Sequence, residues 1–217
     1  MAINRLKGKK ILITAGPTWV AIDSVRVISN IASGETGILL AEKLRQSGAK
    51  VTLLLGPVSA CCLNKKLKLV RYKFFQELKE KLIGELKTGR FDAVIHSAAV
   101  SDYQPLNLYP GKVKSDLKNW KLPLKPTEKI INLIKKADKE VFAVGFKFQP
   151  GAKKALLLRD AKKLMQQAGL DLVVANTQAD NKYQAYIIDS FRGVSPLFSN
   201  KGSLASGLVK SIGALIR

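Results

Sequence analysis

The chain has 217 residues, and its 37 Lys and Arg against 16 Asp and Glu give a formal net charge of +21 at pH 7. Hydrophobic residues make up 47% and charged residues 24%, which is typical of a globular protein and excludes a disordered polypeptide. No apolar run reaches the roughly 18 residues of a membrane span, and the N-terminus lacks a signal-peptide pattern. We therefore expect a cytoplasmic protein without membrane partners, folded as a single domain over residues 1–217.

The chain has few residues for disulfides or transition-metal sites. Its two cysteines, Cys61 and Cys62, are adjacent, and His96 is its only histidine. Such a set supplies neither a disulfide framework nor a four-ligand zinc site. We expect both cysteines to be reduced and buried as small apolar residues.

The positive charge raises the question of nucleic-acid binding, because basic surfaces neutralise phosphates. The charge is spread evenly, however, with 17 Lys and Arg in residues 1–110 and 20 in residues 111–217. In helix-like stretches such as Gln76–Lys87, lysines alternate with glutamates and apolar residues, as on a solvated helix face. A nucleic-acid partner is therefore not expected, and the charge favours steering of phosphorylated small molecules into a cleft.

Short apolar runs of strand length alternate with segments of helical periodicity through most of the chain. The predicted extended segments are Lys10–Ala15, Lys50–Leu55, Leu67–Tyr72, Phe91–Ala98, Trp120–Leu124, Val141–Phe146, Leu170–Ala175 and Tyr183–Ile188. The predicted helices are Gly37–Ser47, Phe75–Lys87, Glu128–Lys136, Lys153–Gln167 and Gly202–Leu215. This alternation predicts an α/β fold, a Rossmann-like three-layer sandwich with a mainly parallel central sheet and a small antiparallel extension. Ligands of such folds bind beyond the carboxyl ends of the strands.

The first of the loops at strand ends, Gly16–Gly37, is too long for a simple dinucleotide fingerprint. About twenty residues separate the predicted strand from the helix, whereas that fingerprint joins the two by a short glycine-rich turn. Its apolar residues argue against disorder. Ser33 and Gly34, just before the helix, offer backbone N–H groups and a helix N-terminus, which together form a phosphate cradle.

Three polar residues of the same loop are candidates for ligand contacts. Asp23, Arg26 and Asn30 provide an anion clamp and hydrogen-bonding side chains. The alternative is an ion pair between Asp23 and Arg26 that only braces the loop. The residues alone leave both interpretations open.

The second loop, His96–Lys114, combines small residues with charged ones. Ala98 and its small neighbours at a strand end allow close approach of a ligand to the backbone. Asp102 could accept a hydrogen bond from a ribose or hold Mg²⁺ through water. Lys112 and Lys114 could reach triphosphate oxygens, although lysines of a basic protein more often face solvent. His96 lies inside the predicted strand, where a core histidine is the more common case.

A third candidate is Phe146 at the end of its strand, next to a glycine. Its ring could pack against a nucleobase or sugar, or it could be a plain core residue. The chain has no P-loop and no nucleophile elbow.

Taken together, the motifs resemble those of the phosphopantothenoylcysteine synthetases of the DNA/pantothenate metabolism flavoprotein family. The resemblance runs in order from about residue 9 to residue 190. The motifs that carry it are Ile13–Thr18, Ile22–Asn30, Ser33–Gly37, His96–Tyr103, Gly111–Ser115, Val144–Phe146 and Leu170–Asn176.

The resemblance implies a ligase of coenzyme A biosynthesis. In that family, 4′-phosphopantothenate reacts with a nucleoside triphosphate, typically CTP, to give an acyl-nucleotide and pyrophosphate. The amine of L-cysteine then attacks the acyl group and releases the nucleoside monophosphate. The resemblance further implies Mg²⁺ and a homodimer whose active sites draw on both subunits.

The resemblance also assigns roles to particular residues. Asn30 stabilises the acyl-nucleotide, Arg26 positions the phosphorylated substrate, and Lys112 neutralises the triphosphate during activation. The implied nucleotide-binding residues are Gly16, Ser33, Gly34, Ala98, Asp102, Lys112 and Phe146, with Asp102 also the candidate for a Mg²⁺ contact.

The chain departs from the family pattern at several positions. Glu35 and Thr36 replace the usual Lys-Met, and Ser115 replaces the last lysine after Lys112. Leu164 and Ala168 stand where the family often carries nucleotide-contacting lysines. These changes leave the choice between CTP and ATP open. At 217 residues we expect a stand-alone synthetase without the fused decarboxylase and without flavin.

Two other classes of function are compatible with parts of the pattern. An NAD(P)-dependent reductase would suit a Rossmann-like sheet, but the short glycine fingerprint is missing. A nucleic-acid-binding protein is motivated by the charge of +21 alone.

Overall fold

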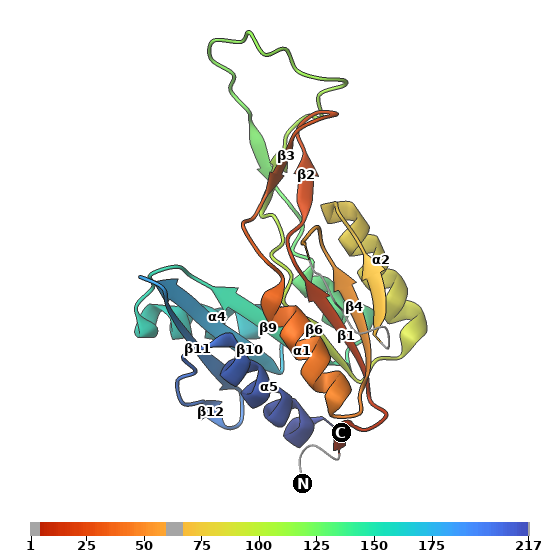
Figure 1. The fold of residues 1–217 in the computed structure, drawn as a ribbon, viewed down its shortest axis with the longest axis vertical. Helices are drawn as coiled ribbons and strands as arrows, with labels where there is room; N and C mark the ends of the chain where they lie inside the picture. Colours follow the sequence, from red (N-terminus) through yellow and green to blue (C-terminus); the bar gives the residue numbers. More distant parts are fainter. Residues whose placement is uncertain (1–4, 60–66, 217) are drawn as a thin grey trace.

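The computed structural model describes residues 5–59 and 67–216, so the cysteine pair lies outside the described residues. Its centre is an eight-stranded sheet with the order β12-β11-β10-β9-β6-β1-β4-β5 (Figure 1). The strands are β1 (Lys10–Ala15), β4 (Lys50–Leu55), β5 (Lys68–Arg71), β6 (Ala93–His96), β9 (Phe142–Phe148), β10 (Leu172–Ala179), β11 (Lys182–Asp189) and β12 (Gly193–Val194).

The sheet is mainly parallel. β5, β4, β1, β6, β9 and β10 pair in parallel, and β11 and β12 add an antiparallel extension at one edge. β1 and β4 are buried along nearly their whole length, which explains why their sequences are continuous apolar runs. The predicted fold class is confirmed.

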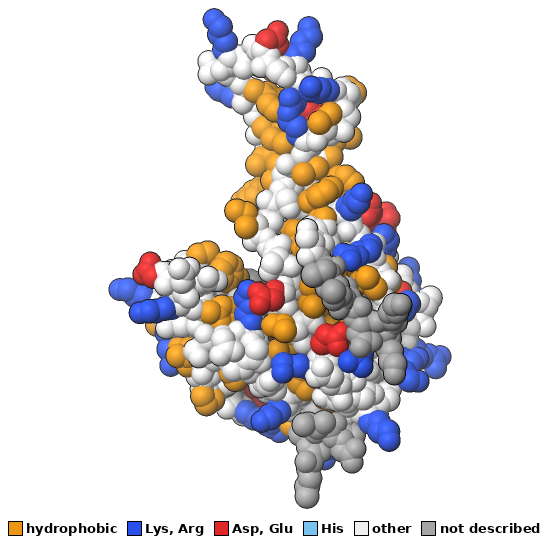
Figure 2. All heavy atoms as spheres, in the orientation of Figure 1, with side chains coloured by type: hydrophobic (Ala, Val, Ile, Leu, Met, Phe, Trp, Pro, Cys, Tyr) orange, Lys and Arg blue, Asp and Glu red, His pale blue; other side chains and the backbone are white. Residues whose placement is uncertain are grey.

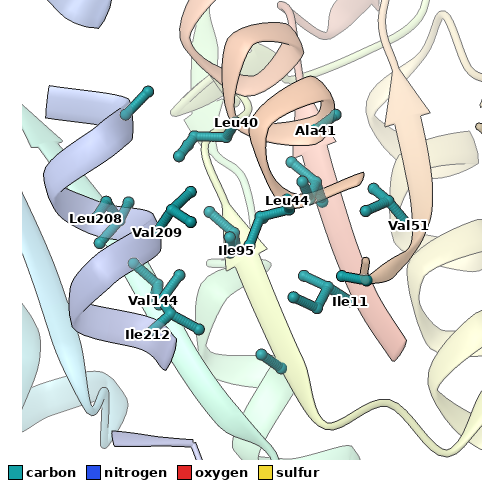
Figure 3. Close-up of a cluster of buried hydrophobic side chains, with 14 of the residues drawn as sticks. Ile11, Leu40, Ala41, Leu44, Val51, Ile95, Val144, Leu208, Val209 and Ile212 are labelled. Carbon is teal, nitrogen blue, oxygen red and sulfur yellow. The ribbon is translucent and has the colours of Figure 1, made fainter. Parts of the chain in front are cut away.

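Helices cover both faces of the sheet. They are α1 (Glu35–Gln46), α2 (Phe75–Gly89), α3 (Ile131–Ala137), α4 (Lys154–Ala168) and α5 (Lys201–Leu215). α1 and α5 pack on one face, where Leu44 and Ile212 meet strand residues such as Ile95 (Figure 3). The opposite face carries α2, α3 and α4 over a second apolar cluster. No helix in the described part of the chain is long and apolar enough to cross a membrane.

An arm extends from the body beyond the ends of the central strands (Figure 1). It contains two antiparallel pairs, β2 (Trp19–Ala21) with β3 (Val27–Ser29), and β7 (Tyr103–Pro105) with β8 (Leu124–Pro126). At its base the backbone N–H of Trp19 donates to the carbonyl of Lys73, and the ring of Trp19 packs edge-on against Phe74. Figure 2 shows apolar side chains gathered along the arm.

The arm is the part that sequence patterns predicted least well. The prediction of an extended segment at Trp120–Leu124 is wrong for residues 120–123, because the strand is Leu124–Pro126. β2, β3 and β7 are not predicted at all. Each is three residues long and mostly half-buried or exposed, so none shows the apolar periodicity of a core strand.

Candidate active site

The carboxyl ends of β1, β6 and β9 lie side by side. Thr14 of β1 pairs with His96 of β6, and His96 pairs with Gly145 of β9. Of the predicted site residues, Gly16 follows β1, Ala98 lies two residues after β6, and Phe146 lies in β9 next to Gly145. The strand pairing therefore brings three of the predicted residues to one edge of the sheet.

Glycines let the backbone pack tightly where β1 leaves the sheet. A Cβ atom at Gly16 would lie 3.2 Å from the backbone nitrogen of Gly56, and one at Gly34 would lie 3.3 Å from the Cα of Gly16. Gly16 and Gly34 also have positive φ angles of 83° and 71°, which favour glycine. Behind them, the buried Tyr72 hydroxyl bonds the carbonyl oxygens of Ala15 at 2.8 Å and Gly16 at 3.1 Å. Burial raises the pKa of Tyr72 well above its usual range.

Helix α1 begins at this edge without a side-chain cap. Gly34 occupies the N-cap position, and the Ser33 hydroxyl lies 3.4 Å from the backbone nitrogen of Glu35. The N–H groups of a first helical turn have no partners within the helix and attract anions. Glu35, in that turn, forms an ion pair with Lys201 at the start of α5. Ser33 and Gly34 thus lie where a phosphate group would meet the helix.

Asn30 joins the first loop to the turn after β6. Its Nδ2 donates to the carbonyl oxygens of Ala99 at 3.1 Å and Val100 at 3.0 Å. Nδ2 is engaged by these two carbonyls, so Oδ1 is the side-chain atom left for a ligand. The structure therefore brings Asn30 to the two residues that follow the predicted residue Ala98.

The turn after β6 is also fixed by the continuation of β1. The N–H of Ala99 donates to the carbonyl of Gly16 at 2.9 Å, and the N–H of Ser101 donates to the Thr18 hydroxyl at 2.9 Å. Next along the chain, the exposed Asp102 pairs with Lys129. Among residues 5–59 and 67–216, no group of three or more His, Cys, Asp and Glu could hold a metal ion.

His96 lies inside β6 and is buried. Desolvation lowers its pKa to about 4, so the ring is neutral at pH 7. Its Nδ1 lies 2.8 Å from the Thr14 hydroxyl. The more common interpretation from the sequence, a core histidine, agrees with this location.

Arg26 and Lys112 are on the arm rather than at the sheet edge. The Asp23 carboxylate accepts from the backbone N–H of Val25 at 2.8 Å, Arg26 at 2.7 Å and Val113 at 3.1 Å, and from the Arg26 guanidinium. These bonds tie the turn between β2 and β3 to the segment that contains Lys112. Burial alone would raise the pKa of Asp23, but these hydrogen bonds lower it to about 2.

The guanidinium of Arg26 has further partners within the arm. It donates to the carbonyl of Val113 at 3.2 Å and lies 5.5 Å from the centre of the Trp120 ring. Trp120 in turn packs edge-on against Tyr109. The bracing ion pair that the sequence allowed is therefore present, whereas Lys112 is exposed after Gly111.

The candidate nucleobase contacts are on two different faces. Phe146 is half-buried against the cluster under α1 and α5. Leu164 and Ala168 of α4 pack into the cluster on the opposite face, while the adjacent Lys162 and Lys163 are exposed. The α4 positions that the family pattern associates with lysines therefore belong to the core of this chain.

Two threonine hydroxyls at this edge were missed by the sequence analysis. Thr14 and Thr18 are fully buried, and each accepts a hydrogen bond from the turn after β6. A threonine at the end of an apolar strand, as in Lys10–Ala15, was the signal that could have identified Thr14. Tyr72 had no comparable signal, because it follows β5 and its hydroxyl bonds carbonyl oxygens at the end of β1, far away in the sequence.

The fold and this edge define an α/β protein whose candidate ligand site lies at the carboxyl ends of parallel strands, beside a helix N-terminus. The family model described as DNA/pantothenate metabolism flavoprotein C-terminal domain matches residues 6–212, and the chain belongs to this family. The resemblance read from the motifs is confirmed at the level of the family.

Individual relatives agree with this membership. The coenzyme A biosynthesis bifunctional protein CoaBC of Thermococcus kodakarensis is 39% identical over 172 residues, which cover 79% of this chain and 42% of that protein. The DNA/pantothenate metabolism flavoprotein structure from Streptococcus pneumoniae superposes with a TM-score of 0.85 at 26% identity, covering 95% of this chain and 99% of that one. The C-terminal domain of a CoaBC gives 0.79 at 27% identity, covering 98% and 97%. The chain thus spans less than half of the Thermococcus relative and nearly all of the two solved chains.

Proposed function

We propose that this chain is a phosphopantothenate–cysteine ligase of coenzyme A biosynthesis, with CTP more than ATP as its activating nucleotide. The observation that carries the proposal is the Asn30 amide bonded to the Ala98–Val100 turn beside an uncapped helix N-terminus. This is the arrangement that the family motifs would build for an acyl-nucleotide. Membership of the family, together with the CoaBC names of its relatives, supports the reaction.

In the proposed first step, a carboxylate oxygen of 4′-phosphopantothenate attacks the α-phosphorus of the nucleotide. The bond from that phosphorus to the β-phosphate oxygen breaks, and pyrophosphate leaves. The N–H groups at Ser33 and Gly34 would hold phosphate oxygens, and Lys112 would neutralise charge on the departing pyrophosphate. Phe146 would line the nucleotide site.

A magnesium ion fits this site without a dedicated protein cage. Mg²⁺ is commonly held by substrate phosphates, waters and one or two carboxylates, and Asp102 is exposed at the edge. When bound, Mg²⁺ would supply charge neutralisation on the triphosphate. Lys129, the present partner of Asp102, would then have to move aside or share the carboxylate.

In the proposed second step, the cysteine amine attacks the acyl carbon. The bond from that carbon to the phosphate oxygen breaks, the nucleoside monophosphate leaves with the bonding electron pair, and the amine releases a proton to solvent. Asn30 is suited to orientation rather than proton transfer, because an amide does not titrate. Its free Oδ1 would accept a hydrogen bond from the attacking amine.

We further propose that the site is completed by a second copy of the chain. Arg26 and Lys112, with their implied substrate and triphosphate roles, lie on the arm, while Asn30 lies at the sheet edge. The arm also exposes large apolar side chains, including Val25 at 65% and Leu108 at 68%. A contiguous apolar surface of this kind favours a protein partner, and an arm that reaches another copy would bring both cations to that copy's edge.

The deciding experiment measures pyrophosphate release with Mg²⁺, 4′-phosphopantothenate and L-cysteine, comparing CTP with ATP. Pyrophosphate release that requires 4′-phosphopantothenate, together with amide formation that also requires L-cysteine, would support the ligase. A higher rate with CTP would support the nucleotide assignment. No release with either nucleotide from folded protein would contradict the proposal. Tightly bound FMN in purified protein would contradict the flavin-free expectation.

A further inference from the structure

Thr14 links the single histidine of the chain to the turn that contains Ala98. Its hydroxyl oxygen lies 2.8 Å from His96 Nδ1 and accepts the backbone N–H of Ala98 at 3.3 Å. Its carbonyl accepts the backbone N–H of Ser97 at 3.1 Å and the Ser97 hydroxyl at 2.7 Å. Thr14 thus makes four contacts with the last residue of β6 and the two residues after it.

One arrangement of protons satisfies His96 Nδ1, the Thr14 hydroxyl and the N–H of Ala98 at the same time. If the ring carries its proton on Nε2, then Nδ1 is free to accept the hydroxyl proton of Thr14. The Thr14 oxygen can then accept from Ala98 with a lone pair. The other neutral tautomer would place a proton on Nδ1, and the Thr14 hydroxyl proton would lose this acceptor. The neutral ring with Nδ1 unprotonated therefore takes the hydroxyl proton and leaves a lone pair of the Thr14 oxygen directed at the N–H of Ala98.

Burial makes the hydrogen bond between Thr14 and His96 stronger than a similar bond at the surface. Thr14 is fully buried and His96 is 6% exposed, so water cannot readily replace either partner. The space on the helix side of the turn is also filled, because a Cβ atom at Gly37 of α1 would lie 2.7 Å from the Ser97 hydroxyl. Ser97 is therefore held between β1 and α1, while Ala98 packs against the apolar cluster on the opposite face of the sheet.

We propose that Thr14 and His96 are positioning residues that set the backbone of the Ala98 turn for nucleotide binding. The inference rests on the proposed function, because it takes this turn to contact the nucleotide. Neither side chain needs to touch the substrate. Loss of the Thr14 hydroxyl would free the N–H of Ala98 to reorient. The affinity for the nucleotide would then fall more than the affinity for cysteine.

The test uses a pair of variants that differ in the hydroxyl. Thr14→Val keeps the shape of the side chain without the hydroxyl, and Thr14→Ser keeps the hydroxyl. We expect Thr14→Val to raise KM for the nucleotide about tenfold, with KM for cysteine changed less than about twofold. Thr14→Ser should restore most of the nucleotide affinity. Equal KM values for the two variants, or equal changes for both substrates, would overturn the inference.

A second pair tests the ring through the same readout. His96→Asn keeps a side-chain oxygen near the place of Nδ1, whereas His96→Leu removes the acceptor. The nucleotide KM should rise more in His96→Leu than in His96→Asn. The reverse order would contradict a role for the acceptor nitrogen.

Nuclear magnetic resonance of the unsubstituted protein provides a measurement that needs no variant to fold. Because the chain has one histidine, its imidazole signals need no residue assignment. We expect the ¹⁵N pattern of a neutral ring protonated on Nε2, and a shift of both ring nitrogens when CTP and Mg²⁺ are added. A ring protonated on Nδ1, or signals unchanged at saturating nucleotide, would overturn the inference.

These measurements distinguish failure of the proposed ligase activity from failure of the proposed role of Thr14 and His96. An inactive but folded wild-type protein would contradict the ligase, while the ring signals would still show whether a nucleotide reaches the turn. An active protein with a nucleotide KM indifferent to Thr14→Val would leave the ligase intact and remove Thr14 and His96 from it.

Discussion

The side-chain amide of Asn30 donates to the carbonyl oxygen of Ala99 at 3.1 Å, across 69 positions of sequence. This bond and its neighbour to Val100 attach the loop after β3 to the turn after β6. Asn30 is itself exposed, so its hydrogen bonds hold two loops together at the exposed edge of the sheet and add nothing to the core. The same residue therefore has a structural task and, in the proposed reaction, a chemical one.

Replacement of this amide should separate the two half-reactions. Asn30→Ala should retain pyrophosphate release at saturating nucleotide and lose amide formation, because the attacking amine would lose its acceptor. Loss of the two exposed hydrogen bonds should lower the free energy of unfolding by about 1–2 kcal/mol, which leaves the protein folded. Parallel assays of pyrophosphate and amide product test this, with Asn132→Ala on the exposed side of α3 as the control. Full amide formation in Asn30→Ala would remove Asn30 from the reaction.

Lys112 should act one step earlier. Lys112→Gln should lower pyrophosphate release itself by about tenfold or more, because activation develops charge on the departing phosphates. Lys118→Gln in the same segment removes another exposed charge and should have a small effect. Equal losses in both variants would indicate general attraction of the nucleotide by the basic arm, and not a specific contact.

The sequence predicted the body of this protein well and the arm poorly. Runs such as Lys10–Ala15 and Lys50–Leu55 are buried nearly end to end, so their composition alone identified them as central strands. The rule that ligands bind at carboxyl strand ends then pointed to Gly16 and Ala98, which strand pairing brings to one edge of the sheet. The arm strands bury little surface and carry no periodic signal, so the location of Arg26 and Lys112 depended on contacts such as Asp23 with Val113, 90 positions apart.

The apolar surface of the arm should support association of two copies. Leu108→Glu introduces a charge at a side chain that is 68% exposed, and it should weaken the proposed dimer by at least about tenfold. Phe191→Glu, at a 92% exposed side chain in the turn between β11 and β12, is the matched control. Light scattering over a range of concentrations measures the association. A dimer unchanged by Leu108→Glu would contradict an interface at this part of the arm.

Glu35 is an unusual residue for a phosphate cradle, since its charge would repel a triphosphate from the start of α1. The ion pair with Lys201 offsets that charge. Lys201→Gln should therefore weaken nucleotide binding by about fivefold, and the double variant Glu35→Gln with Lys201→Gln should restore it. Titration calorimetry with the nucleotide measures both effects. Equal weakening in the single and double variants would instead identify Lys201 as a direct phosphate contact.

The buried state of His96 predicts the pH dependence of folding. Its pKa is about 4 in the folded protein against 6.5 for an ordinary histidine, so the unfolded chain binds more protons between these values. The contribution of this residue to stability is complete above pH 6.5 and falls as the pH decreases through 4, by at most about 3 kcal/mol. Urea unfolding at pH 7 and pH 4.5 should show the loss, and His96→Asn should remove that part of the difference. A pH titration of the single imidazole signal measures the pKa of His96 directly. A midpoint near 6.5 would mean that the ring is not held in the buried, neutral state on which its hydrogen bond with Thr14 depends.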